Sequence, residues 1–311
     1  MRFQILGLCG LALIMLGLLF QSNFESQKSE SRLVFPNLKA QLAGLETVEI
    51  INLNEERVSI VKKESGWVLE NKHEYRADFS TLSEFLINLS VLKIVEEKTR
   101  ISANHKKLGL AERGTGAAIR VSMMPGENSI LIGNQASSIG SFVRYENEPQ
   151  VFLTDDSIDV STEWIDWVDP VVINIPMDVV NTVEIESSSG AIFSGVKNEE
   201  SGVFELLAMP QGRELKYPTV VDSMARLLVN IRMLDLEPYN SITFTDSSSV
   251  RFGLGSEETI VVRSIAFGGE FMMHIDRSDL SDWQFKISEL TFKELNKDVE
   301  AMLKPLDSDF E

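Results

Sequence analysis

One pattern of strand, turn and helix occurs twice in this chain, and it limits the possible folds more than any other feature. The first copy runs from Thr47 to Val95 and the second from Thr182 to Leu236. Each opens on a Thr-Val-Glu-Ile run, turns at Glu-Ser-Gly, passes a tyrosine and ends in an amphipathic segment. The openings lie 135 positions apart, a period far too long for a solenoid repeat or a propeller blade. The pattern therefore predicts two repeats of domain size.

The amphipathic segments match most closely. Along residues 79–92 the apolar side chains recur every three or four positions, as they do on a helix with one apolar face. A shift of 142 positions carries each of them onto an apolar residue of the 221–236 segment and carries Asn88 onto Asn230, which predicts a second helix there. Short β-prone runs separated by turn residues precede both segments and indicate antiparallel hairpins.

Local signals predict three further elements. Thr259–Phe267 and Glu270–Asp276 are β-prone runs joined by Gly-Gly, a good two-residue hairpin loop. A short helix is expected to end near Trp164–Val168, because an Asp-Pro dipeptide follows. A terminal helix is expected near Ser288–Leu303.

The N-terminus carries an apolar run, Ile5 to Phe20, with Arg2 just before it. Counted from Phe3, a helix of this run would span about 27 Å, close to the hydrocarbon thickness of a bilayer. The run also suits a cleaved signal peptide, but it ends in large residues where cleavage requires small ones. We therefore predict an uncleaved signal anchor, with the C-terminal bulk outside the cytoplasm.

Composition limits the class of protein and its partners. Hydrophobic residues make up 43% and charged residues 24% of the 311 residues, which is typical of a globular chain. The net charge of −18 disfavours nucleic acid as a partner. The one cysteine, Cys9, lies in the predicted anchor, so the exported part has no disulfide and no thiolate.

The predicted fold class is α+β, with an N-terminal transmembrane helix and then two tandem repeats of antiparallel strands, each with a packed amphipathic helix. How the repeats pack stays open at this point. The predicted segments are a transmembrane signal anchor (1–21), a polar tether (22–32), a first α+β repeat (33–170), a second α+β repeat (171–305) and an acidic tail (306–311).

Motifs that would indicate catalysis are lacking. The three histidines stand far apart and belong to no zinc-binding pattern. The chain has no Gly-x-Ser-x-Gly elbow and no phosphate-binding glycine loop. Asp276, Asp279 and Asp282 lack the spacing of a calcium loop. We therefore predict no catalytic, cofactor-binding or metal-binding residues, no cofactor and no enzymatic activity.

A weak candidate for an interaction surface is the pair Trp164 and Trp167. Three positions apart on a helix, they share one face, and aromatic pairs of this kind stack on sugar rings or dock partners. The alternative is that they seal the end of the first repeat against its sheet.

Several short motifs together resemble a known family. A membrane helix is followed by a Val-Glu-Ile strand, a Gly-Trp-Val-Leu hairpin at Gly66–Leu69 and an amphipathic helix. Leu108–Leu110 reads Leu-Gly-Leu, Ile132-Gly133 follows, and an acidic tryptophan segment lies near Trp164–Trp167. Over roughly Leu33 to Leu303 the chain resembles the bacterial domain of unknown function 4340 family.

The resemblance implies a location and a role. Members of the family are membrane-anchored and extracytoplasmic, and their genes often accompany ABC-type transport systems of the gliding-associated kind. We therefore expect a single-pass protein of the bacterial inner membrane, with its bulk in the periplasm, that is a non-enzymatic partner of an ABC-type transporter. The alternative is a module that binds envelope glycan or lipid. A hydrolase whose carboxylates converge only in the fold ranks last.

Overall fold

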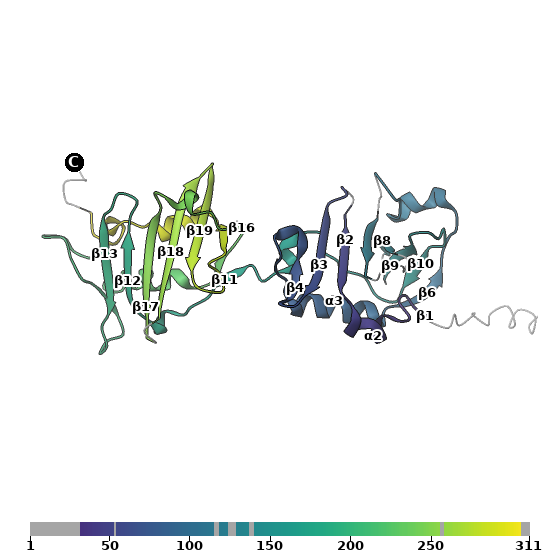
Figure 1. The fold of residues 1–311 in the computed structure, drawn as a ribbon, viewed down its shortest axis with the longest axis horizontal. Helices are drawn as coiled ribbons and strands as arrows, with labels where there is room; N and C mark the ends of the chain where they lie inside the picture. The colour runs from purple at the N-terminus through teal and green to yellow at the C-terminus, as the bar shows by residue number, and fades with distance from the viewer. Residues whose placement is uncertain are drawn as a thin grey trace, which may run out of the picture. The chain divides into compact units, whose positions relative to one another are not determined.

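The computed structural model describes residues 32–52, 54–114, 118–123, 129–136, 140–255 and 258–305 (Figure 1). The chain divides into two compact units. The first consists of residues 1–66 and 79–162, and the second of residues 67–78 and 163–311. The division after Thr162 precedes the predicted seam at residue 170, and the short segment 67–78 belongs to the second unit. Antiparallel strands dominate both units and helices are few, so the α+β class is confirmed.

The first sheet has the strand order β1-β6-β10-β9-β8-β7-β2-β3-β4-β5. Its strands are β1 (Arg32–Leu33), β2 (Thr47–Ile51), β3 (Arg57–Lys63), β4 (Gly66–Leu69), β5 (Tyr75–Arg76), β6 (Lys93–Glu97), β7 (Ile119–Ser122), β8 (Ile130–Gln135), β9 (Ser141–Tyr145) and β10 (Phe152–Thr154). Strand β5 and all of β4 except Gly66 lie in segment 67–78. The helical elements of this part of the chain are α2 (Leu38–Gln41), α3 (Phe79–Val91) and the 3-10 helices η1 (Leu42–Gly44), η2 (Glu70–Lys72) and η3 (Ser102–Leu108).

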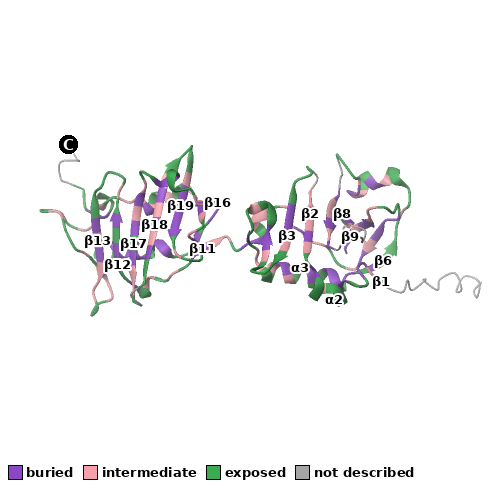
Figure 2. Ribbon diagram, in the orientation of Figure 1, coloured by how far each residue is buried: buried purple, intermediate pink, exposed green. Residues whose placement is uncertain are grey.

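Helix α3 forms where the apolar residues of the sequence recur every three or four positions. Leu82, Phe85, Leu86 and Leu89 are buried, as predicted from their spacing. Burial alternates from residue to residue along strand β2, where Val48 and Ile50 are buried and their neighbours are half-exposed. Figure 2 shows this alternation along the strands. The first core thus lies between one helix and one face of the sheet.

The second sheet has the strand order β14-β13-β12-β17-β18-β19-β20-β16. Its strands are β12 (Val180–Glu186), β13 (Ile192–Lys197), β14 (Phe204–Leu206), β16 (Asp235–Pro238), β17 (Ser248–Leu254), β18 (Thr259–Phe267), β19 (Glu270–Asp276) and β20 (Trp283–Lys286). Strands β11 (Val171–Ile173) and β15 (Ile231–Arg232) form a separate pair. The helical elements are α4 (Asp222–Ala225), α5 (Glu289–Leu295), η4 (Trp164–Trp167), η5 (Met177–Val179), η6 (Arg226–Leu228), η7 (Ser241–Phe244) and η8 (Val299–Met302).

The α-helices α4 and α5 lie on one face of the second sheet, and the 3-10 helix η7 lies at the other face. Gly195 on β13 faces α4, since a Cβ at this glycine would lie 3.1 Å from a side-chain carbon of Val221. At the other end of the same face, Asn296 after α5 donates a hydrogen bond to the buried Ser264 hydroxyl at 2.8 Å. The opposite face of β18 carries Arg263 and Phe267, which are not buried. We call it the open face.

The two sheets share one strand order. From β6 to β4, the first sheet runs β6-β10-β9-β8-β7-β2-β3-β4, and the second runs β16-β20-β19-β18-β17-β12-β13-β14. Eight strands of the first sheet thus have a counterpart at the same place in the second, whereas β1 and β5 at its ends have none there.

The helix predicted over 221–236 is wrong beyond Leu228. Asn230 has a positive φ of 53°, a left-handed conformation that ends a helix. The side-chain oxygen of Asn174 accepts the Asn230 backbone N–H at 3.1 Å and fixes this turn. The chain then forms β15 and β16, so Asn88 in α3 has no helical counterpart at Asn230.

The structure also tests the predicted hairpin, the predicted terminal helix and the predicted short helix before Pro170. The hairpin of β18 and β19 is confirmed, and its Gly268 and Gly269 have φ values of 60° and 85°, as a two-residue turn requires. The predicted terminal helix over 288–303 is interrupted, because α5 ends at Leu295 and η8 begins at Val299. The short helix before Pro170 is present as η4.

The predicted anchor (1–21), the tether (22–32, apart from Arg32) and the acidic tail (306–311) lie outside the described residues. Within the described ranges, no helix has the length and apolar character needed to cross a membrane.

Candidate functional site

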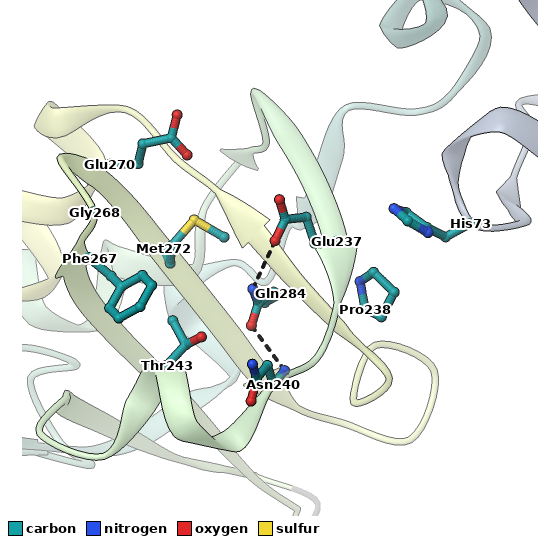
Figure 3. Close-up of a pocket in the computed structure, with 10 residues that line it drawn as sticks. All are labelled: His73, Glu237, Pro238, Asn240, Thr243, Phe267, Gly268, Glu270, Met272 and Gln284. Carbon is teal, nitrogen blue, oxygen red and sulfur yellow. Dashed lines mark hydrogen bonds between the residues drawn. The ribbon is translucent and has the colours of Figure 1, made fainter.

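A pocket of about 530 Å³ opens on the open face of the second sheet (Figure 3). Strands β16, β19 and β20, the 3-10 helix η7 and the β18–β19 hairpin supply most of its wall. The lining residues are His73, Glu237, Pro238, Asn240, Thr243, Phe267, Gly268, Glu270, Met272 and Gln284.

Strand register brings these side chains to one face. Phe267 on β18 pairs with Glu270 on β19, and Met272 lies two residues further along β19 on the same face. Gln284 on β20 pairs with Glu237 on β16, which sets both beside the β19 residues. The tight Gly-Gly turn leaves the Phe267 ring 53% exposed at the rim of the pocket.

Gln284 forms the fixed polar part of the pocket. Its residue is only 4% exposed, and both ends of its amide are hydrogen-bonded (Figure 3). The side-chain oxygen accepts the Asn240 backbone N–H at 3.0 Å, and the side-chain nitrogen donates to a Glu237 carboxylate oxygen at 3.3 Å. The network holds the Glu237 carboxylate in place without neutralising its charge.

Carboxylates outnumber cations around the pocket. Lys286 pairs with Glu270, and this hydrogen bond raises the pKa of the lysine, as do the charges of Asp235 and Glu237. Asp235 is also paired with Lys72, at 2.7 Å. Three carboxylates thus share two ammonium groups, and the pocket keeps a negative charge that is centred on Glu237.

Comparison with known proteins gives one match. A family model described as "Domain of unknown function (DUF4340)" matches residues 67–254, more than half of the chain. The chain belongs to this family. No curated protein and no solved structure matches it. The DUF4340 match includes Glu237 and Asn240, while Phe267 and Gln284 lie beyond its end.

Beside the pocket of this DUF4340 chain lies a buried histidine, His274. Its Nδ1–H donates to the Trp283 carbonyl at 2.9 Å, and its ring stacks on Tyr239 with centroids 3.8 Å apart. Burial lowers the pKa of His274, and the charge of Arg263 acts in the same direction. The hydrogen bond to Trp283 and the charge of Asp276 oppose this shift. The imidazole is therefore neutral. Its neighbour across the strands, Gln284, lines the pocket.

The second unit should lose stability when His274 is protonated. Because the folded-state pKa lies below the ordinary value of about 6.5, the contribution of neutral His274 is complete above that pH and is lost as the pH falls through it. We expect urea unfolding, followed by tryptophan fluorescence, to give a smaller free energy at about pH 5 than at about pH 7.5. The variant His274→Phe, which keeps an aromatic ring on Tyr239, should show a weaker dependence. Equal pH dependence in the two proteins would exclude this role of His274.

The two predicted tryptophans differ in exposure. Trp167 is only 3% exposed, and its backbone carbonyl accepts the Asp78 N–H at 2.8 Å, so its ring belongs to the interior of the second unit. Trp164 is half-buried, with the Lys72 ammonium 4.3 Å from the centre of its ring. The interaction surface predicted at these two residues stays a prediction, and Trp164 is the member that solvent reaches.

The three histidines of the described residues occupy separate places. His73 lines the pocket, whereas His105 lies in η3 and His274 is buried in β19. In the part of the chain that the structure describes, no group of three or more histidine, cysteine or acidic side chains could hold a metal ion.

Sequence reasoning missed the pocket residues Glu237, Phe267 and Gln284. They stand on three strands, and only the register of those strands brings them together. The one local signal was the Gly-Gly turn, which fixes Phe267 as the last residue before a tight hairpin loop.

Proposed function

We propose that this DUF4340 protein is a non-enzymatic binding protein that holds a partner on the open face of its second unit. The observation that carries the proposal is the pocket, where an exposed Phe267 ring stands beside polar groups already fixed by hydrogen bonds. Side chains fixed in advance lose little entropy on binding, and an exposed aromatic ring is a frequent anchor of protein interfaces.

The partner we propose is a subunit of an ABC-type transport system. The support is the family membership together with the apolar run at residues 5–20, which suits a single-pass anchor in the bacterial inner membrane. On this proposal the described units lie in the periplasm, where they contact the periplasmic side of the transporter.

We also propose that the two units arose by duplication. The shared strand order and the recurring Thr-Val-Glu-Ile strand support this, since Thr47 opens β2 and Thr182 lies in its counterpart β12. Residues common to both copies are then mainly core and turn residues. Function is expected where the copies differ, and the pocket of the second unit is such a place.

Affinity purification of the full chain from native membranes should recover subunits of an ABC-type transporter. A chain that carries an unrelated membrane helix in place of residues 1–21 is the matched control, and it should recover the same subunits because the described units hold the partner. Recovery of no transporter subunit, together with full function of a chain that lacks any anchor, would exclude the proposal.

The alternative is that the protein is a module that binds envelope glycan or lipid. The half-exposed Trp164 ring favours it, because an indole face stacks well on a sugar ring. On this alternative the chain binds isolated envelope fractions, and Trp164→Ala weakens that binding. Unchanged binding by the variant would remove Trp164 from the site.

A further inference from the structure

We propose that the pocket takes up a basic side chain of the partner, whose guanidinium or ammonium group pairs with Glu237 beside the Phe267 ring. The inference rests on the proposed function and names the chemistry by which that site recognises its partner. Charge and shape support it, and the first unit shows a guanidinium held on the corresponding face.

Charge favours a cation. No ion pair to Glu237 is present within the described residues, although the charge of Glu237 acts on Lys286 and its carboxylate accepts a hydrogen bond from Gln284. Glu270 stands across the pocket and shares its charge with Lys286. Because the whole chain also has a net charge of −18, a basic partner is attracted over a distance as well as at contact.

The shape of the pocket suits a long basic side chain. Met272 and Pro238 provide apolar surface for the aliphatic stem of an arginine or a lysine. The exposed Phe267 ring offers its face to the charged end, where a cation is attracted by the ring electrons. Figure 3 shows this ring on one side of the pocket and the Glu237 carboxylate on the other.

The first unit shows how the corresponding face holds a guanidinium. Counted across the paired strands, Ile51, Arg120, Leu131 and Arg144 of the first sheet correspond to Glu186, Ser249, Arg263 and His274 of the second. Arg144 is buried on this face and donates to three backbone carbonyls, those of Tyr145, Glu146 and Glu148, through one nitrogen. Another nitrogen pairs with the Glu112 carboxylate at 3.0 Å.

At the place of Arg144 the second unit has His274 instead, and the guanidinium on this face belongs to Arg263, which pairs with His274 across β18 and β19. The space next to it is the pocket with the Glu237 carboxylate. None of the residues that line the pocket is an arginine or a lysine, so its carboxylates Glu237 and Glu270 face a space without a lining cation.

Methionine methyl groups allow a direct test on the full chain in detergent micelles. Met272 lines the pocket, while its neighbour Met273 faces the covered side and is fully buried. With ¹³C-methyl methionine, titration with capped arginine (acetyl-Arg-methylamide) should move the Met272 signal and leave the Met273 signal in place. We expect a Kd on the order of 1 mM for this single residue.

Capped citrulline has the shape of arginine without its charge and should not move the Met272 signal. Glu237→Gln should weaken arginine binding by up to about fivefold, which is the range of a solvent-exposed ion pair. Glu289→Gln is the matched control, because it removes a carboxylate that pairs with Lys293 on the other face of the sheet. It should leave the affinity unchanged, and the Met273 signal shows that each variant is folded.

Butylguanidinium distinguishes a protein side chain from a free basic solute. Weaker binding than that of capped arginine supports a side chain carried on a peptide. If butylguanidinium and capped arginine bind equally well, the pocket recognises a cation, but the cation can come from a protein side chain or from a free solute. That result contradicts the proposal that the cation is carried on a peptide. Equal binding of arginine and citrulline, or no effect of Glu237→Gln, overturns the proposal as a whole.

The two proposals fail separately. If transporter subunits are recovered from membranes but capped arginine leaves Met272 unmoved, the binding function stands and the basic side chain is wrong. If arginine binds but no transporter subunit is recovered, the pocket chemistry stands and the partner is wrong.

Discussion

Replacing Arg144 with methionine is expected to lower the free energy of unfolding of the first unit by about 3–5 kcal/mol. The side chain is only 4% exposed and forms the centre of a polar network. Besides the carbonyls of Tyr145, Glu146 and Glu148, it donates from Nε to the Leu110 carbonyl at 3.3 Å. Methionine is apolar, so it removes all of these hydrogen bonds and leaves the buried Leu110 carbonyl without the donor that Arg144 supplies.

Lysine should not rescue the loss. An ammonium is a compact group with three donors, so it cannot reach carbonyls on two loops as the flat guanidinium of Arg144 does. Arg57→Met is the matched control, because Arg57 is 57% exposed and pairs with Glu49 at the surface of the same unit. That change should cost about 1 kcal/mol or less.

The measurement can separate the two units. All four tryptophans, at positions 67, 164, 167 and 283, belong to the second unit. Denaturation followed by circular dichroism should therefore show an earlier transition in Arg144→Met, while the tryptophan fluorescence transition stays in place. If the circular dichroism midpoint does not move, the network at Arg144 contributes little to stability.

Gly140→Ala is expected to destabilise the first unit by about 2–4 kcal/mol. Gly140 has a φ of 76°, which an alanine adopts only with strain. A Cβ at this position would lie 1.9 Å from the Thr154 backbone oxygen, so the start of β9 would have to move away from β10. The movement would also break the hydrogen bond from the Ser141 N–H to the Thr154 hydroxyl, which is 2.8 Å long.

Gly114→Ala isolates the effect of the backbone angle. Gly114 has a φ of 73° in the same unit, but a Cβ there meets nothing within 4 Å. It should cost only the strain of a left-handed alanine, about 1–2 kcal/mol. The same circular dichroism experiment measures both variants, and an equal cost would show that the contact with Thr154 is unimportant.

Much of the fold follows from the sequence, because period and turn chemistry act locally. The apolar stripe of 79–91 predicts α3, and Gly268-Gly269 predicts the β18–β19 hairpin. The helix over 221–236 fails where Asn230 takes a left-handed conformation that is fixed by Asn174, a residue far away in the sequence. A repeated apolar pattern therefore predicts which residues are buried. It predicts less well whether those residues form a helix or a strand.

The pocket could not be predicted for a different reason. Glu237, Phe267 and Gln284 carry no motif, and their meeting depends on strand order and register, which single-strand patterns do not contain. Trp164 and Trp167 lie in the same short 3-10 helix, but Trp167 is buried and only Trp164 is within reach of solvent.

The most direct test of the central claim is photo-crosslinking from two positions of the full chain in native membranes. A photoreactive phenylalanine at Phe267 lies at the pocket, whereas one at Leu290, which is 71% exposed on α5, lies on the other face of the sheet. Mass spectrometry should identify a subunit of an ABC-type transporter crosslinked from position 267 and not from position 290. Crosslinks to a transporter subunit from position 290 alone, or from neither position, would contradict the account.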